Sequence, residues 1–157
     1  MAVRGTCVMF QEAMKYFAEG DIDISTDTFK LGIIDDTAAP AADDTSPTWS
    51  DYSTNEVATT GNYTANGETL TTVTSAMVSG IYTMGADDVN IAMNASGFTD
   101  GAYGIVYESV SDLAIGFVQL DDADGNPVSE QAGPVDIEWP GGVVLRLPAN
   151  ALTWETP

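Results

Sequence analysis

The chain has 157 residues, 44% of them hydrophobic, which predicts a single globular domain over residues 1–157 with a core of its own. Lys and Arg number 4 against 24 Asp and Glu, a formal net charge of −20. Nucleic-acid binding needs Lys and Arg that neutralise phosphates, so we expect no DNA or RNA partner. An anionic membrane would repel such a surface, and the longest apolar runs are too short to span a bilayer. A basic partner, function at high ionic strength and simple solubility remain compatible with the charge.

The residue types that carry most enzymatic chemistry are scarce. No histidine is present, which removes Ser-His-Asp and Cys-His arrangements and the commonest metal ligand. The single cysteine, Cys7, excludes an internal disulfide, and without a histidine to activate it we expect an inert side chain. The sequence therefore predicts a protein that is not an enzyme and that uses no cofactor and no metal.

Apolar residues near the N-terminus recur at helical spacing. Polar residues face the other way and Gly20 is a typical helix end, so we predict one amphipathic N-terminal helix over residues 6–19. This helix would lie on the apolar face of a sheet or, as the less favoured alternative, form an arm that docks on a neighbouring subunit. The side chains that would make this contact are Met9, Phe10, Met14 and Phe17.

Short strands separated by turn residues follow the predicted helix. Residues 28–34 have the composition of a strong strand, and residues 35–47, rich in Ala, Asp, Thr and Pro, predict a long loop. Trp49 and Tyr52 should anchor the far end of that loop in the core. Further along, Asn66-Gly67 suits a turn with positive φ, and we expect strands at residues 69–77, 81–84 and 88–93.

The clearest strand pattern lies between residues 103 and 147. Residues 103–107 and 113–118 should pair antiparallel across a short polar link. Residues 135–139 alternate apolar with acidic, which places Ile137 inward and its acidic neighbours in solvent. After Pro140-Gly141-Gly142, we expect residues 143–147 to pair antiparallel with residues 135–139.

These elements predict a mainly β fold, an antiparallel β-sandwich or jelly roll of about eight strands with one N-terminal helix. Residues 148–157 would form an extended C-terminal tail. Trp154 has few apolar neighbours along the chain, and tryptophan is favoured at interface centres. We therefore expect the helix or the tail to pack on another chain.

The acidic run 121–125 invites comparison with a calcium loop. Leu120 stands at the first ligand position of the EF-hand pattern and Gln131 at the last, where carboxylates are required. A solvated loop is thus the better interpretation of residues 121–126. A pair of carboxylates that hydrolyses a glycosidic bond is a further alternative, but the sequence does not single out one pair among so many acids.

Several short motifs, taken in order, resemble those of structural proteins of tailed bacteriophages. In that group a "GDID…TDTxK" run follows a helix and enters the first strand. The sequence departs from the group at Asn90-Ile91, where a tryptophan is usual, and in its longer acidic loop. The matching segments here are residues 20–31, 49–51, 55–57, 63–70, 86–89, 102–107, 115–117, 137–139 and 144–147.

This resemblance implies a virion component, and within the group a capsid decoration (cement) protein. Such a protein would bind the major capsid protein on the outer surface of the virion and stabilise the shell, after residing in the host cytoplasm during assembly. We expect a homo-oligomer, because a symmetric oligomer can engage several shell subunits at once. A trimer is favoured over a dimer, and the sequence does not decide between the two.

Two alternatives from other classes stay open. A tail or baseplate adhesion module would bind host-surface carbohydrate, and it would require Trp49, Tyr52 and Tyr63 to be exposed. A hydrolase would require the carboxylate pair discussed above. A glycan-binding screen tests the first alternative and turnover of polysaccharides the second.

Overall fold

A computed structural model describes residues 2–4, 7–121 and 125–147 of the chain. Within these residues the fold is mainly β, with two short α-helices and eleven strands instead of about eight. The helices are α1 (Ala13–Glu19) and α2 (Trp49–Tyr52). The strands are β1 (Ala2–Arg4), β2 (Val8–Met9), β3 (Phe29–Ile34), β4 (Glu68–Thr69), β5 (Thr74–Val78), β6 (Ile81–Gly85), β7 (Val89–Ile91), β8 (Tyr103–Glu108), β9 (Ala114–Gln119), β10 (Val135–Glu138) and β11 (Val143–Arg146).

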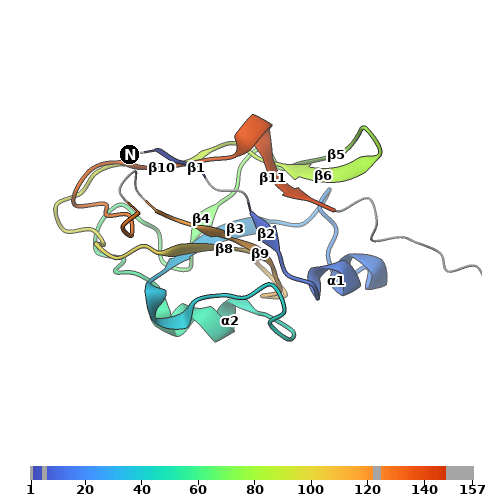
Figure 1. The fold of residues 1–157 in the computed structure, drawn as a ribbon, viewed down its shortest axis with the longest axis horizontal. Helices are drawn as coiled ribbons and strands as arrows, with labels where there is room; N and C mark the ends of the chain where they lie inside the picture. Colours follow the sequence, from blue (N-terminus) through green and yellow to red (C-terminus); the bar gives the residue numbers. More distant parts are fainter. Residues whose placement is uncertain (1, 5–6, 122–124, 148–157) are drawn as a thin grey trace, which may run out of the picture.

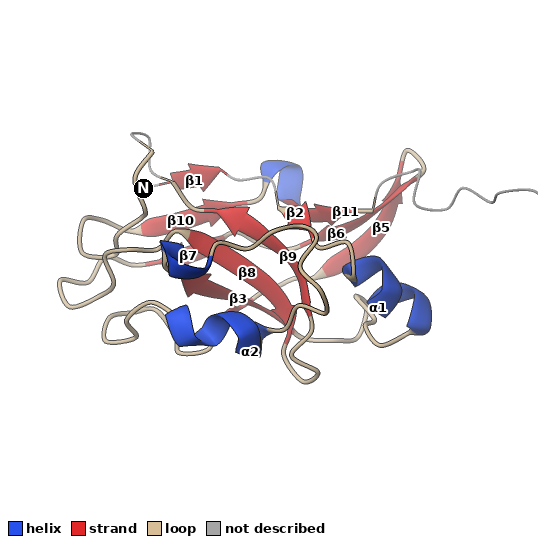
Figure 2. Ribbon diagram, turned by 60° about the horizontal axis from the view of Figure 1, so that its bottom comes forward, coloured by secondary structure: helices blue, strands red, loops and turns tan. Residues whose placement is uncertain are grey.

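The strands form three sheets that are stacked in layers. The largest sheet has the order β2-β9-β8-β3-β4 and lies in the middle of the molecule (Figure 1). Two three-stranded sheets, β1-β10-β7 and β11-β6-β5, cover one of its faces, and α2 with its flanking loop covers the other. Figure 2 shows both helices lying outside the sheets. No described helix is long and apolar enough to cross a membrane.

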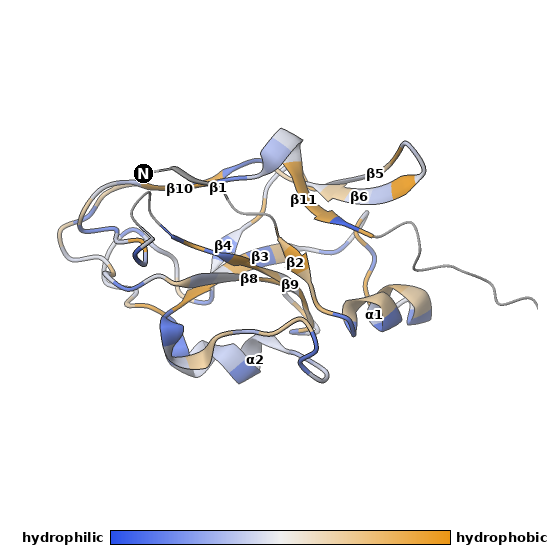
Figure 3. Cartoon of the chain, viewed as in Figure 1, coloured by the Kyte–Doolittle hydropathy of each residue, from blue (hydrophilic) through white to orange (hydrophobic). Residues whose placement is uncertain are grey.

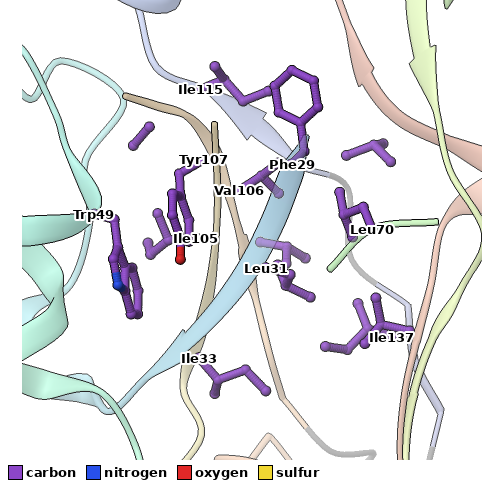
Figure 4. Close-up of a cluster of buried hydrophobic side chains, with 14 of the residues drawn as sticks. Phe29, Leu31, Ile33, Trp49, Leu70, Ile105, Val106, Tyr107, Ile115 and Ile137 are labelled. Atoms are coloured by element: carbon purple, nitrogen blue, oxygen red, sulfur yellow. The ribbon is translucent and has the colours of Figure 1, made fainter. Parts of the chain in front are cut away.

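The core surrounds the central sheet on both faces. Leu31 of β3 points toward Leu70 and Ile137, whereas Trp49 lies on the opposite side of the sheet (Figure 4). The Trp49 ring stacks on Tyr107, with centroids 5.1 Å apart and planes 6° apart. Figure 3 shows hydrophobic residues on β2 of the central sheet and on β11 of a sheet that covers it. Burial on both faces explains why β3 and β8 are nearly continuous apolar runs without strict alternation.

The antiparallel pairing predicted for residues 103–107 and 113–118 is confirmed. β8 and β9 are antiparallel, with Ile105 opposite Phe117, and β3 pairs with the other edge of β8. The predicted turn at Asn66-Gly67 is also confirmed, since both residues have positive φ, 61° and 87°. The segment predicted as one strand over residues 69–77 instead gives β4 and β5, which are separated where Thr72 takes a φ of 52°.

The prediction of an N-terminal helix over residues 6–19 is wrong at its start. Two strands precede α1, and β2 pairs antiparallel with β9, with Val8 opposite Phe117. The Phe10 N–H continues this pairing by donating to the Ile115 carbonyl at 3.1 Å. The backbone of Val8, Met9 and Phe10 is therefore hydrogen-bonded to the edge of β9, and the helix begins only at Ala13. Its end at Gly20, in the left-handed region, is as predicted.

The expected hairpin between residues 135–139 and 143–147 is also wrong. β10 pairs antiparallel with β7 and parallel with β1, whereas β11 pairs with β6. Gly141 and Gly142 both have positive φ within a 3-10 turn, and this turn leads the chain into a different sheet. The face assignment holds nevertheless: Ile137 is fully buried, and Asp136 and Glu138 are partly exposed.

The turn between β8 and β9 is held by a buried carboxylate, Glu108, which is only 4% exposed. It accepts hydrogen bonds from the N–H groups of Val110, at 2.9 Å, and Ser111, at 2.5 Å. Burial alone would raise the Glu108 pKa, but hydrogen bonds from Ser111, Val110 and Ser109 outweigh burial and lower it below its ordinary value of 4.5.

This lowered pKa predicts a pH-dependent contribution to stability. The hydrogen bonds should stabilise the fold fully above about pH 4.5, and the contribution should be lost as the pH falls through the folded-state pKa. Glu108→Gln should therefore unfold more easily than the parent at pH 7, by about 1 kcal/mol. Urea unfolding at pH 7 and pH 3 checks this, and a difference between the two proteins that grows toward low pH would contradict it.

Candidate interaction surface

The single cysteine and the acidic side chains are the first candidates for a reactive or metal-binding site. Cys7 is half-buried and lines a hollow with Val143, Val144 and Arg146. Burial raises the pKa of the Cys7 thiol to about 12, so at neutral pH it is a protonated thiol and not a nucleophile. No cluster of three or more Cys, Asp or Glu within the described residues is arranged to hold a metal ion. Part of the acidic loop 121–126 lies outside those residues.

Glu130 is fully buried, and no pattern in the sequence indicates this burial. Its Oε1 accepts the Asn62 N–H at 2.5 Å, which ties the β10 side of the molecule to the loop before β4. The carboxylate fits between Gly61 and Gly97, where an added Cβ would come within 2.4 and 2.3 Å of its oxygens. The Glu130 N–H donates to the Phe98 carbonyl at 3.0 Å, so Glu130 connects the loop of Gly97 to the loop of Gly61. Glycine at both positions leaves the space for its side chain.

The aromatic side chains that a sugar-binding face would need lie inside the protein. Trp49, Tyr52 and Tyr63 are 4%, 6% and 2% exposed. The Tyr63 hydroxyl donates to Glu56 at 2.9 Å and accepts the Ile33 N–H at 2.8 Å. The Tyr52 hydroxyl donates to Asp44 at 2.7 Å, which anchors the loop as predicted. These three residues therefore do not form an exposed platform for carbohydrate.

The structure separates the residues predicted to contact another chain. Phe10 is fully buried and stacks with Tyr52, so its side chain is already used within its own chain. Met9 and Phe17 are partly exposed and pack against the core, and Met14 on α1 is partly exposed as well. Trp154 and the tail over residues 148–157 lie outside the described residues.

β5 is the strand with the most exposed side chains, and it was not among the segments predicted to contact another chain. All five residues of β5 are exposed, including Met77 at 65% and Val78 at 53%. β5 forms the outer edge of its sheet and pairs within the described residues only with β6. The chain carries no charged residue between Glu68 and Asp87, its longest uncharged stretch, although its net charge is −20.

α1 lies at the same end of the molecule as the β5–β6 hairpin (Figures 1 and 2). Phe17 of α1 and Tyr82 of β6 line one shared hollow, and Tyr82 lies opposite Met77 in the hairpin. We call Met14, Phe17, Met77, Val78 and Tyr82 the end surface. It combines two residues of the predicted contact with a strand edge, and exposed Asp23 also lines the hollow. We treat it as the candidate surface for binding another protein.

The chain was compared with protein-family models, curated proteins and solved structures, and none of them matches it.

Proposed function

We propose that this protein is a decoration (cement) protein of a tailed bacteriophage, which binds the outside of the assembled capsid and stabilises it without chemistry. The observation that carries the proposal is the end surface, whose apolar side chains include the exposed Met77 and Val78 of a hairpin without charged residues, on a chain whose net charge is −20. The resemblance of its ordered motifs to those of phage structural proteins supports it. In this proposal the stacked sheets of the protein act as the rigid scaffold that a β-sandwich was expected to supply.

The proposed partners are the major capsid protein and further copies of the chain. An acidic protein can bind a shell either by pairing with basic patches or through apolar and main-chain contacts. Pairing of charges weakens as salt rises, because ions screen it, whereas apolar contacts tolerate salt. The apolar side chains of the end surface favour the second mode. Several weak contacts gain avidity when an oligomer engages neighbouring shell subunits.

Reconstitution tests this function. Particles stripped of the protein should rebind it, and re-addition should raise the temperature at which heat releases the genome. Binding should fall less than about tenfold between 50 and 500 mM salt, since few charged contacts contribute. An unrelated acidic protein of similar size and charge is the control.

Failure to rebind, or rebinding without a rise in the release temperature, would contradict the cement function. Binding of the purified protein to host-surface glycans would favour the adhesion module instead.

A further inference from the structure

We propose that Asn66 is a site of spontaneous backbone modification, which the native turn keeps closed and whose rate the Tyr107 hydroxyl controls. The site is independent of the proposed function, because modification concerns the covalent structure of the chain and no contact with a capsid. Three observations support it: the residue pair at the turn, the hydrogen bonds that hold the turn, and the close packing of Gly67 on β3.

The chemistry follows from the pair Asn66-Gly67, the only asparagine in the chain that precedes a glycine. Asn66 is exposed, and glycine leaves its own backbone nitrogen the least hindered. This nitrogen gives its proton to solvent and attacks the side-chain carbonyl carbon of Asn66. A bond forms between these two atoms, and the side-chain nitrogen takes up a proton and leaves as ammonia. Water then opens the resulting succinimide at either carbonyl, which gives aspartate or isoaspartate.

Hydrogen bonds hold this pair in a closed turn. The Gly67 N–H, which carries the attacking nitrogen, donates to the Thr64 carbonyl at 3.0 Å. The Asn66 N–H donates to Glu56 Oε1 at 2.7 Å, and the Asn66 carbonyl accepts a hydrogen bond from the Tyr107 hydroxyl. The attacking nitrogen is therefore engaged, and side chains from two distant parts of the chain fix both backbone groups of Asn66.

Gly67 is also packed too closely to turn toward the Asn66 side chain. It is buried with a φ of 87°, and an added Cβ would come within 2.7 Å of the Leu31 carbonyl oxygen and 2.8 Å of the Gly32 nitrogen. Closing the succinimide ring requires rotation about the Cα–C bond of Asn66, which moves Gly67 away from β3. The modification rate should therefore equal that of an open chain multiplied by the fraction of time for which the turn is open.

Modification would be irreversible and would damage this side of the fold. Both products place a carboxylate at position 66, beside that of Glu56, and like charges repel. Isoaspartate also adds a methylene group to the backbone before Gly67. β4 begins at the next residue, Glu68, which lies opposite Leu31 of β3. Modified chains should therefore lose the pairing of β4 with the central sheet.

Peptide mapping by mass spectrometry tests the site, on the full chain incubated at mildly alkaline pH. The parent should convert at Asn66 at least about tenfold more slowly than the same chain in urea, because the turn is closed most of the time. Tyr107→Phe removes only the hydroxyl, so the ring can keep its stacking on Trp49. It should raise the rate about fivefold, the effect of losing one hydrogen bond from the closed turn.

Two control variants make this result specific. Tyr103→Phe removes a hydroxyl from the same strand, β8, and leaves the hydrogen bonds of the turn in place. Ile137→Val weakens the core in another sheet by about as much as one hydrogen bond. Both should convert at Asn66 like the parent, because the turn opens without unfolding of the whole chain. If Tyr107→Phe does not fold, Glu56→Gln tests the turn from the Asn66 N–H side, and it should also raise the rate.

Three results would overturn the proposal. Conversion of the folded parent as fast as in urea would mean that the turn gives no protection. A Tyr107→Phe rate equal to that of the parent would remove the hydroxyl from the control of the site. An Ile137→Val rate raised as much as that of Tyr107→Phe would mean that Asn66 reacts only when the whole chain unfolds.

Discussion

Ile137→Asp is expected to prevent the chain from accumulating as a folded, soluble protein. Ile137 is fully buried in β10, between Val3 of β1 and Val89 of β7. A carboxylate at this position would be buried without a partner, which costs several kcal/mol, and the apolar contacts of isoleucine would be lost as well. Together these losses are comparable with a domain's whole stability of about 5–15 kcal/mol. Soluble yield and a thermal melt followed by circular dichroism measure the effect.

Met93→Asp is the matched control, because it introduces the same carboxylate at an exposed apolar position, 56% exposed, shortly after β7. Its melting temperature should stay close to that of the parent. If Ile137→Asp melted like this control, the inward face of β10 would be assigned incorrectly.

The face of β10 was predictable from the sequence, but its partners were not. Strict alternation over residues 135–139 shows which side chains face inward, since successive side chains point to opposite faces. It does not show which strand lies beside them. β10 pairs with β1 from the start of the chain and with β7, and such distant pairings leave no local pattern. β8 and β9 were predictable because a short link joins them.

The misplaced helix start has a similar cause. Val8, Met9 and Phe10 continue the apolar spacing of α1, and a short apolar run suits either a helix or a strand. The open edge of β9 decided the outcome, because it offered hydrogen-bonding partners to these residues. Periodicity also marked Phe10 as a contact residue, although an apolar position identifies burial and does not distinguish a core from an interface.

The end surface was half predictable. Met14 and Phe17 followed from helical spacing, whereas Met77 lay in a segment recognised only as a Thr-rich strand. Whether a strand lies at the edge of a sheet depends on how the other strands pair, so the sequence of the strand alone does not predict it. The available signal was the absence of charge between Glu68 and Asp87, which stands out only against the acidity of the remaining chain.

Gly32→Ala should destabilise the protein by about 3 kcal/mol through one side chain, Trp49. Gly32 lies in β3 directly beneath the indole, where an added Cβ would come within 2.3 Å of two ring carbons. The ring is rigid, 4% exposed and stacked on Tyr107, so it has no nearby space to move into. Relieving the overlap would shift Trp49 and with it α2, which that residue begins.

A red-shifted tryptophan fluorescence maximum together with a lower urea midpoint is the expected signature of Gly32→Ala. Gly133→Ala is the control, because Gly133 has no neighbouring atom within 4 Å of an added Cβ and its φ is not positive. That variant should match the parent in both measurements. An unchanged midpoint in Gly32→Ala would mean that the indole does not lie over Gly32 in solution. A lower midpoint without a fluorescence change would place the strain elsewhere in β3.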